Sequence, residues 1–500
     1  MREEILRMER VTYLEQGTPQ LENFSMTLWE GEIFGLIPVN HYGISSLLKL
    51  LRQNLPLHYG YVYYRERLVN HWRGGNSGTN RISIIQNKSC LAEGLTVADN
   101  IFVLRPGFKK RFISPRVLEK QLEPFMRDID MNISGDAYVE TLSPFEKFVV
   151  ELLKAVVAGH RLVVLEDIGN FISDRELKKI HKILRHYADQ GISFLYIASH
   201  FEEVRQICHR TALMMNGVII KCFQQSDRVP ATFLLDCVEE FERKVKEQIE
   251  KKPELPGQPG AVFQAAELCL GGAGRLSFSV APGECLVLQD LDNEIFPGLI
   301  EVLSGKQEPQ EGRIYVEGAL IGGRGDRRIA VVQELATKTM LFPNVSYMDN
   351  LCFTLDHRFP DVWMRGRIKK SIRQEYAGFL GEEVFDLSVE ALSERQKYEL
   401  VYTRILLQNP RVVFCVQPFK GAEVAMRLRV WELLALLLER GIAVVILAVN
   451  LADSLALADR LIQVRQGRVE AEYDREDFAK LPVDTPWLYL YQQRVIDKKN

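Results

Sequence analysis

Short apolar runs alternate with segments of helical periodicity along the first half of the chain. The apolar runs predict buried strands at Ile33–Ile37, Ile82–Ile85, Leu162–Leu165 and Phe194–Ala198. The segments between them predict helices at Ser45–Leu51, Phe145–Val157 and Asp174–Tyr187. This alternation predicts an α/β fold in which helices cover a mainly parallel sheet. Ligands bind such sheets at the carboxyl ends of the strands, so the residues that follow the strands are the candidates for function.

The second half of the chain repeats features of the first. The repeated features, displaced by 250 or 252 residues, are Asp-Asn at 99–100 and 349–350, Leu-Ser at 142–143 and 392–393, Arg210 and Arg460, Gly217 and Gly467, and Gly-Glu at 31–32 and 283–284. A shared displacement predicts two copies of one domain. We place the copies at residues 1–240 and 263–500, joined by a charged linker with Pro and Gly residues at 241–262.

Composition narrows the class of protein. The 500 residues include 63 Lys and Arg against 66 Asp and Glu, a balance that lacks the basic footprint of proteins that coat nucleic acid. The eight Cys residues are scattered singly, which is typical of a reducing compartment and predicts no metal-binding cysteine cluster. No apolar run reaches the roughly 20 residues that span a membrane, and the N-terminus lacks a secretory signal. We therefore expect a cytoplasmic protein without a nucleic-acid partner.

The order of features within each half is specific. An aromatic residue near the start is followed by a strand–turn–helix, a strand ending in Gln, Leu-Ser before a helix, and two further apolar strands. In the first half these two strands end in an acid pair and in a His residue. This order resembles the ATP-binding cassette (ABC) family, and the tandem arrangement resembles the ATP-binding subunits of ribose-, galactose- and xylose-type sugar importers. The resemblance implies two P-loop NTPase-like domains, each with a mainly parallel sheet and a helical subdomain, that bind ATP with Mg²⁺.

The phosphate-binding loops depart from the pattern G-x-x-x-x-G-K-[ST], in which backbone N–H groups and a Lys hold the phosphates. Ile44 stands at the Lys position of the first half, and Phe296 stands there in the second. Pro38, His41 and Tyr42 also replace small residues of the first loop. The residues that match the family pattern are Asn40, Gly43, Ser45 and Ser46. Asp290, Asp292 and Glu294 crowd the second loop, so we expect weak ATP binding in the first domain only.

Other motif positions are also altered. After the strand at 162–165 the acids read Glu166-Asp167, the reverse of the family order, and the second half has Val416-Gln417. The resemblance makes Glu166, Asp167 and His200 the candidate catalytic residues, with Asn450 at the His position of the second half. It places Mg²⁺ on Ser45 and Glu166, and the adenine on Tyr13. The Q-loop candidates are Gln86 or Asn87 in the first half and Gln333 in the second. The signature sequences begin with Leu142-Ser143 and Leu392-Ser393 but lack the glycines that permit close approach.

Each retained residue also has a structural interpretation. His200 suits a helix cap as well as a γ-phosphate switch. Tyr13 suits packing on the sheet as well as adenine stacking. The pair Glu166-Asp167 suits a cap of the next helix as well as a metal site. The sequence leaves these alternatives open.

Three functions are compatible with these features. We favour a pseudo-ATPase whose two halves form an intrinsic pseudo-dimer and bind a membrane permease, at the inner face of the membrane, or a signalling or regulatory protein. The first alternative is a working ATPase that energises sugar import through a permease. The second is a ribosome- or nucleic-acid-associated tandem ABC protein. The family contacts its permease near the Q-loops, within 88–130 and 334–385 here, where the candidate contact residues are Phe108, Phe112, Phe125, Phe359 and Trp363.

Overall fold

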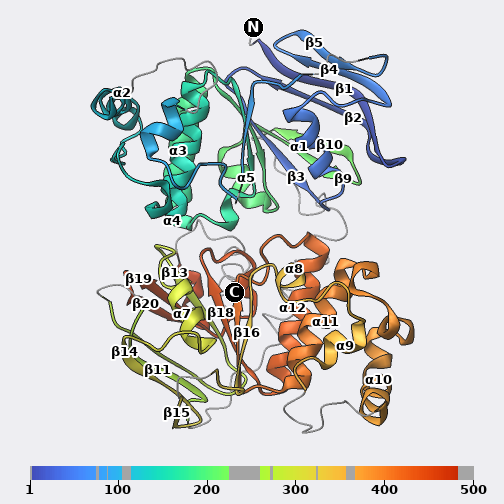
Figure 1. Ribbon diagram of the computed structural model, residues 1–500, viewed down its shortest axis with the longest axis vertical. Coiled ribbons are helices and arrows are strands. Elements are labelled where there is room, and N and C mark those ends of the chain that lie inside the picture. Colours follow the sequence, from blue (N-terminus) through green and yellow to red (C-terminus); the bar gives the residue numbers. More distant parts are fainter. Residues whose placement is uncertain are drawn as a thin grey trace, which may run out of the picture. The chain divides into compact units, whose positions relative to one another are not determined.

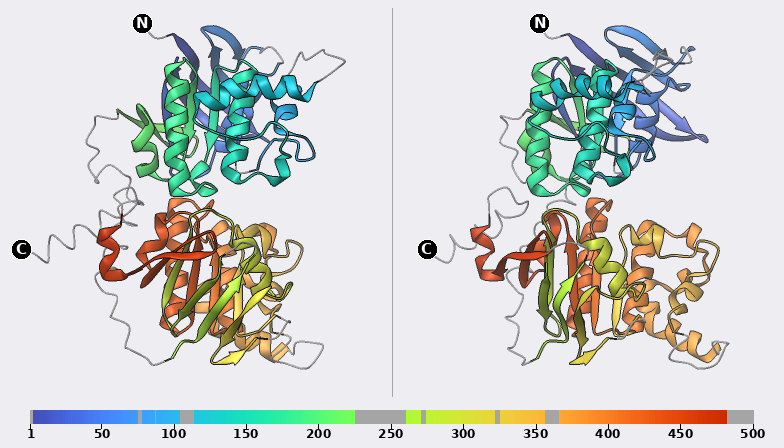
Figure 2. Two further views of the ribbon diagram at one scale, coloured as in Figure 1. Left: turned by 90° about the vertical axis from the view of Figure 1, so that its left-hand side faces the viewer. Right: turned by 60° about the vertical axis from the view of Figure 1, so that its left-hand side comes forward.

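The chain divides into two compact units, Met1–Phe233 and Leu234–Asn500. The computed structural model describes residues 3–74, 78–86, 88–103, 114–224, 260–270, 274–321, 325–355 and 366–481 (Figures 1 and 2). Most of the predicted linker, up to residue 259, lies outside the described residues, so its boundaries stay a prediction. None of the described helices is long and apolar enough to cross a membrane.

The central sheet of unit 1 has six strands in the order β10-β9-β3-β8-β7-β6. Neighbouring strands are parallel except for β10, which pairs antiparallel with β9. The strands are β3 (Ile33–Pro38), β6 (Ile82–Ile85), β7 (Leu162–Glu166), β8 (Ser193–Ile197), β9 (Arg210–Met215) and β10 (Val218–Gln224). The sheet therefore confirms the predicted α/β class and the four predicted strands.

Helices and a second sheet bury both faces of this central sheet. Along β7, Val163 and Leu165 pack with one core and Leu162 and Val164 with another, which explains why the strand is apolar throughout. The first core lies under α3 and the second under α1 (Figure 1). The helices of unit 1 are α1 (Ile44–Arg52), α2 (Pro115–Asp128), α3 (Pro144–Val157), α4 (Asp174–Asp189) and α5 (Phe201–Ile207).

The sequence did not predict the second, antiparallel sheet of each unit. In unit 1 its order is β2-β1-β4-β5, with β1 at Glu4–Glu15, β2 at Thr18–Trp29, β4 at Tyr59–Tyr64 and β5 at Arg67–His71. The pairing of β1 with β2 shifts register between Met8 and Val11. Arg10 and Asn23 have positive φ there, so the period of two that marks a half-buried strand is interrupted.

Unit 2 repeats unit 1 strand by strand. Its sheets have the orders β12-β11-β14-β15 and β16-β17-β18-β13-β19-β20, the second being the order of unit 1 read from the opposite edge. The strands are β11 (Phe263–Cys269), β12 (Leu276–Val280), β13 (Cys285–Asp290), β14 (Glu311–Val316), β15 (Ala319–Leu320), β16 (Ile329–Val332), β17 (Val412–Val416), β18 (Ala443–Ala448), β19 (Arg460–Arg465) and β20 (Arg468–Asp474). The helices are α7 (Phe296–Leu303), α8 (Ala336–Thr339), α9 (Tyr347–Cys352), α10 (Gly366–Leu380), α11 (Glu394–Gln408) and α12 (Val424–Glu439).

The residues that recur between the halves form structural pairs. Arg210 Nε donates to Glu32 Oε1 at 2.6 Å, and Arg460 Nε donates to Glu284 Oε1 at 2.9 Å. Each pair joins the turn before the central strand to the start of its neighbour, β9 or β19. The repeated Glu and Arg residues thus form the same ion pair in each unit.

The repeated Asp-Asn pair braces a loop in each unit. The Asn350 side chain accepts from Phe342 N at 2.9 Å and donates to the carbonyls of Phe342, Val345 and Ser346. The buried Asn100 makes the same kind of contacts with Ala92 and Thr96 in unit 1. This motif serves the fold, since every polar atom of both amides has a backbone partner.

Candidate functional site

The first loop lies at the carboxyl edge of the central sheet, between β3 and α1. Asn40 Nδ2 donates to Asn216 Oδ1 at 2.7 Å and Asn216 N donates back to Asn40 Oδ1 at 3.1 Å, which ties the loop to the turn after β9. Gly43 has φ 83°, and a Cβ there would lie 2.4 Å from the Gln20 carbonyl oxygen. Only glycine fits that position. Ser45 is exposed in the first turn of α1.

The interior of this loop does not offer the charges that phosphate needs. Ile44 is 3% exposed and belongs to the core between α1 and the sheets. Ser46 donates its hydroxyl to Glu15 Oε2 at 3.1 Å, and Lys49 Nζ lies 2.6 Å from Glu15 Oε1. The hydrogen bond from Lys49 lowers the pKa of Glu15, so a carboxylate lies at the first turn of α1. The charge of Lys49 is thereby balanced by Glu15, so the pair offers phosphate no net positive charge.

Tyr13 lies on β1 and packs, partly buried, against the same core. The Tyr42 hydroxyl donates to the Pro19 carbonyl, which holds a large side chain over the loop. Pro38, the last residue of β3, has no backbone N–H to offer a phosphate. The loop therefore connects a strand to a helix, as a phosphate-binding loop does, but few of its groups suit phosphate binding.

The acid pair meets the Q-loop candidate at the ends of β6 and β7. Gln86 Nε2 donates to Glu166 Oε2. Burial raises the pKa of Glu166, and the charge of Asp167 raises it further. Asp167 Oδ1 instead accepts from Ser199 N at 3.1 Å and Ser199 Oγ at 3.2 Å, so this carboxylate is held at the end of β8. The competing Asn87 lies outside the described residues.

The structure also tests whether His200 and the pair Glu166-Asp167 cap helices. His200 occupies the N-cap position of α5, yet its side chain makes no cap hydrogen bond. The next long helix after the acid pair, α4, is capped by Ser173 in a capping box with Glu176. Glu166 and Asp167 therefore do not cap α4. The two acids, Gln86 and His200 all lie at the carboxyl edge of the sheet, as the resemblance implied for a site.

In unit 2 a buried carboxylate accepts N–H groups of the loop between β13 and α7. Asp290, the last residue of β13, is fully buried. Ile295 N donates to Asp290 Oδ2 at 2.7 Å and Asp292 N donates to Oδ1 at 3.3 Å. These are the N–H groups of the loop that leads into α7, so the chain supplies its own anion to the cradle. Burial raises the pKa of Asp290.

The remaining candidate positions of unit 2 have the backbone contacts of their counterparts in unit 1 but different side chains. Gln417 has φ 43° and Asp167 has φ 46°, and the N–H of each donates to a carbonyl at the end of the neighbouring strand, from Leu447 of β18 and Ile197 of β8. Val416 beside Gln417 is buried in the core. Asn450 follows β18 as His200 follows β8.

A buried cation also pairs with an acid at this edge of unit 2. Lys420 Nζ lies 2.6 Å from Glu334 Oε1, and the lysine side chain is 7% exposed. The Q-loop candidate Gln333 is exposed, and its N–H donates to Met340 Sδ at 3.2 Å. Neither contact resembles a metal site, and the described residues of both units contain no group of three or more His, Cys, Asp or Glu residues that could hold a metal ion.

Both signature serines are helix caps. Ser143 Oγ accepts from Glu146 N at 3.2 Å, and Glu146 Oε2 accepts from Ser143 N at 2.9 Å, which is a capping box at the start of α3. Ser393 and Gln396 form the same box at the start of α11. The preceding Leu142 and Leu392 pack with the cores. The spacing S-x-x-E or S-x-x-Q predicts a capping box from sequence alone, a signal that the interpretation of these residues as signature sequences did not use.

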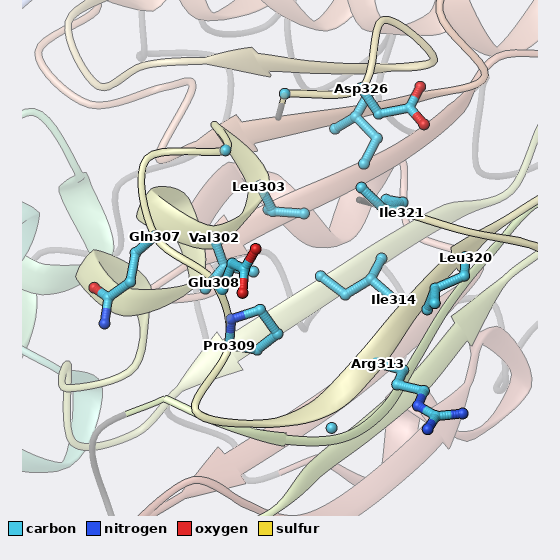
Figure 3. Close-up of a pocket in the computed structure, with 14 residues that line it drawn as sticks. Val302, Leu303, Gln307, Glu308, Pro309, Arg313, Ile314, Leu320, Ile321 and Asp326 are labelled. Atoms are coloured by element: carbon cyan, nitrogen blue, oxygen red, sulfur yellow. The ribbon is translucent and has the colours of Figure 1, made fainter. Parts of the chain in front are cut away.

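A cavity of about 270 Å³ lies in unit 2 beside α7, β14, β15 and β16 (Figure 3). Leu303, Ile314 and Ile321 give it an apolar wall, with Glu308 and Arg313 among its polar residues. It adjoins the C-terminal part of α7, whereas the loop that holds Asp290 precedes the N-terminus of this helix. The cavity is therefore separate from the nucleotide position.

Comparisons with known proteins agree with this fold. A family model described as ABC transporter matches residues 21–168. The ribose import ATP-binding protein RbsA of Halalkalibacterium halodurans is 23% identical over 489 residues, 95% of this chain and 97% of that protein. The RbsA of Geobacillus kaustophilus is 24% identical over 453 residues, 88% of this chain and 90% of that protein.

Among solved structures, RNase-L Inhibitor matches with TM-score 0.59 at 14% identity, covering 94% of this chain and 91% of that one. An archaeal ribosome recycling factor, aABCE1, matches with TM-score 0.58 at 14% identity, covering 94% and 90%. At this identity the likeness shows the fold alone.

Both units therefore have the fold of ABC-type P-loop NTPase domains, and the chain carries two of them in tandem. Along 95% of its length the chain resembles the ribose import ATP-binding proteins.

Proposed function

We propose that this chain is a pseudo-ATPase, a tandem ABC protein that works by docking on a partner and has little or no ATP turnover. The observation that carries the proposal is the burial of an apolar side chain at both Lys positions. Ile44 is 3% and Phe296 is 4% exposed, and both belong to cores. A missing cation at the triphosphate removes the main electrostatic help that P-loop enzymes give to phosphoryl transfer.

ATP with Mg²⁺, the ligand that ABC proteins bind, fits the two units differently. In unit 2 the Asp290 carboxylate already holds the loop N–H groups, so a triphosphate does not fit there. In unit 1 the exposed Ser45 hydroxyl and the Glu166 carboxylate offer two oxygen ligands for Mg²⁺. The Lys49–Glu15 pair and Ile44 offer the phosphates no net positive charge, so we expect weak binding in unit 1 only.

The partner we propose is the membrane permease of an importer, because unit 2 exposes an apolar patch in its helical region. We name Phe342, Val345, Phe353 and Leu387 the Phe342 patch; all four are exposed, Phe353 to 59%. The rings of Phe342 and Phe353 lie 4.5 Å apart between centroids. Exposed apolar clusters mark interaction surfaces. A regulatory protein is the other partner that this surface suits, with the two halves acting as a pseudo-dimer.

None of the contact residues predicted from sequence belongs to the Phe342 patch. Phe108, Phe112, Phe359 and Trp363 lie outside the described residues. Phe125 packs, partly buried, against the core of unit 1, which favours its structural role. Phe342 and Phe353 nevertheless fall within the predicted interval 334–385.

The first experiment measures ATP hydrolysis by the full chain with Mg²⁺. We expect no release of phosphate above that of a matched blank. Turnover of about 1 s⁻¹, within the usual range of enzymes, would show a working ATPase if the variant Glu166→Gln abolished it. Phosphate release that Glu166→Gln leaves unchanged identifies a contaminating enzyme.

The second experiment tests docking with membranes of the native host. The tagged full chain is expected to retain a permease identified by mass spectrometry, and Phe342→Asp with Phe353→Asp should release it. Leu320→Asp is the matched control, because Leu320 is an exposed apolar residue of β15, outside the patch. Recovery of ribosomes in place of a permease would favour the translation-associated alternative and contradict the docking proposal.

A further inference from the structure

The antiparallel sheet of unit 1 carries a row of aromatic side chains on its outer face. Along β4 the residues Gly60 and Val62 are buried, whereas Tyr59, Tyr61 and Tyr63 alternate with them and reach the surface. Tyr59 is 43% exposed. Figure 1 shows β4 and β5 at one margin of this sheet. The alternation follows from the period of two of a strand, with one face in the core and one in solvent.

The edge strand β5 extends this row. His71 lies opposite Tyr61 in the pairing of β4 with β5. The Trp72 ring, which follows β5, lies 5.8 Å from that of Tyr59, and the rings of Tyr61 and Tyr63 lie 6.4 Å apart. We name Tyr59, Tyr61, Tyr63, His71 and Trp72 the tyrosine face.

Three exposed arginines lie in the β4–β5 hairpin and directly after it, close in sequence to the tyrosine face. Arg65, Arg67 and Arg73 are exposed, and within the described part of the chain none of the three forms an ion pair with a carboxylate. The Arg73 guanidinium lies 4.6 Å from the Trp72 ring centroid, and Arg7 lies 3.8 Å from that of Tyr63. Within the β4–β5 hairpin, from Tyr59 to Arg73, Glu66 is the one acid in the sequence. The charge of Arg7 is paired with Glu4 and Glu9, and Glu9 lies opposite Tyr61 in the pairing of β1 with β4. The face thus combines stackable rings with the exposed positive charges of the hairpin arginines.

The duplicated unit shows that the fold does not need these rings. The strand β14 occupies the place of β4, since it pairs antiparallel with β11 as β4 pairs with β1. Its outer positions are Glu311, Arg313 and Tyr315, so two of the three tyrosines have no aromatic counterpart. The rings of unit 1 therefore call for an explanation other than stability.

We propose that the tyrosine face binds single-stranded nucleic acid. Unpaired bases stack on the tyrosine and tryptophan rings, and the phosphates of the strand meet Arg65, Arg67 and Arg73. Stacking on aromatic side chains of a sheet with arginines along the backbone path is the general way in which proteins hold single strands. A near-neutral net charge does not oppose it, because stacking supplies much of the affinity and the charge that matters is local. The proposal does not depend on the permease proposal.

Fluorescence anisotropy of the full chain with a labelled 12-nucleotide oligouridylate tests this. We expect saturable binding, and quenching of Trp72 emission that is absent in Trp72→Phe, assigned by difference because other tryptophans emit. The double variant Tyr59→Ala with Tyr61→Ala should weaken binding by at least about fivefold per ring. Tyr315→Ala, which changes the tyrosine of unit 2 at the sheet position of Tyr63, should leave it unchanged. Circular dichroism and the thermal midpoint verify that each variant folds.

Three results would overturn the proposal. The first is no binding of either oligouridylate or oligothymidylate at low salt. The second is equal affinity for a duplex of the same length, since paired bases cannot stack on the rings. The third is binding of a neutral oligosaccharide to the tyrosine face without binding of the oligonucleotides, which would assign the rings to a sugar.

Discussion

Removing the Asp290 carboxylate is the sharpest test of the structure of unit 2. In Asp290→Ala the buried N–H of Ile295 loses a charged acceptor at 2.7 Å, and Asp292 N loses a weaker one at 3.3 Å. A hydrogen bond to a charged group contributes about 1.5–3 kcal/mol, and the variant also escapes the cost of burying a carboxylate. We therefore expect a net loss of about 2 kcal/mol in the free energy of unfolding of unit 2. For a unit of this size the thermal midpoint should fall by roughly 4–8 °C.

The same variant should gain affinity for inorganic phosphate. With its occupant gone, the N–H cradle before α7 is open to an anion. Phosphate at about ten times its dissociation constant would restore roughly 1.4 kcal/mol. Calorimetry in phosphate and in chloride of equal ionic strength measures this, and hydrogen exchange of residues 291–296 locates it. Asp292→Ala is the matched control, because its carboxylate accepts from Gln466 N instead.

The reasoning is refuted if Asp290→Ala is as stable as the parent chain and exchanges its loop amides no faster. It is also refuted if phosphate stabilises the parent, Asp290→Ala and Asp292→Ala to the same extent, since a general salt effect would then explain the shift. Faster exchange confined to the loop, reversed by phosphate in Asp290→Ala alone, is the expected outcome.

Three further predictions concern the fold. Arg210→Ala should lower the free energy of unfolding of unit 1 by about 1.5–3 kcal/mol, measured by urea unfolding, because the buried Glu32 loses its ion-pair partner. A stability within about 0.5 kcal/mol of the parent would contradict this. Ser143→Ala and Ser393→Ala should each cost about 1 kcal/mol through loss of a cap, with the thermal midpoint as readout. Burial lowers the pKa of His181 to about 4. The stability that its neutral form gives is therefore complete above pH ~6.5 and is lost as the pH falls towards 4, by up to roughly 3 kcal/mol. His181→Gln should flatten that part of the pH profile of stability in urea unfolding, and an unchanged profile would count against this reasoning.

Four strands of the central sheet of unit 1 could be predicted from sequence because apolar runs are strong signals. Both faces of β7 are covered, so its residues Leu162–Leu165 are all apolar and its identity as a strand was plain. The antiparallel sheets were not predicted, because register shifts at Arg10 break the alternation that marks such strands. A strand with a bulge has no regular period to detect.

The site residues stay a prediction, and their contacts could not be predicted from sequence. The acid-rich second loop indicated repulsion of phosphate, but no local pattern indicates that Asp290 accepts the N–H groups of its own loop. The identity of Ile44 predicted a missing cation, whereas its burial depends on how α1 meets the sheets. Tertiary contacts of this kind have no signature in a local pattern.

The hydrogen bonds of the Asn350 side chain to the backbone of Phe342, Val345 and Ser346 have a consequence for the entropy of binding at the Phe342 patch. The four hydrogen bonds of this amide fix the backbone that presents Phe342 and Val345 before any partner arrives. A surface that is already ordered pays little conformational entropy on association, so more of its contact energy remains as affinity. Such preorganisation suits a protein whose task is to hold a partner and does not need a nucleotide cycle to shape the surface first.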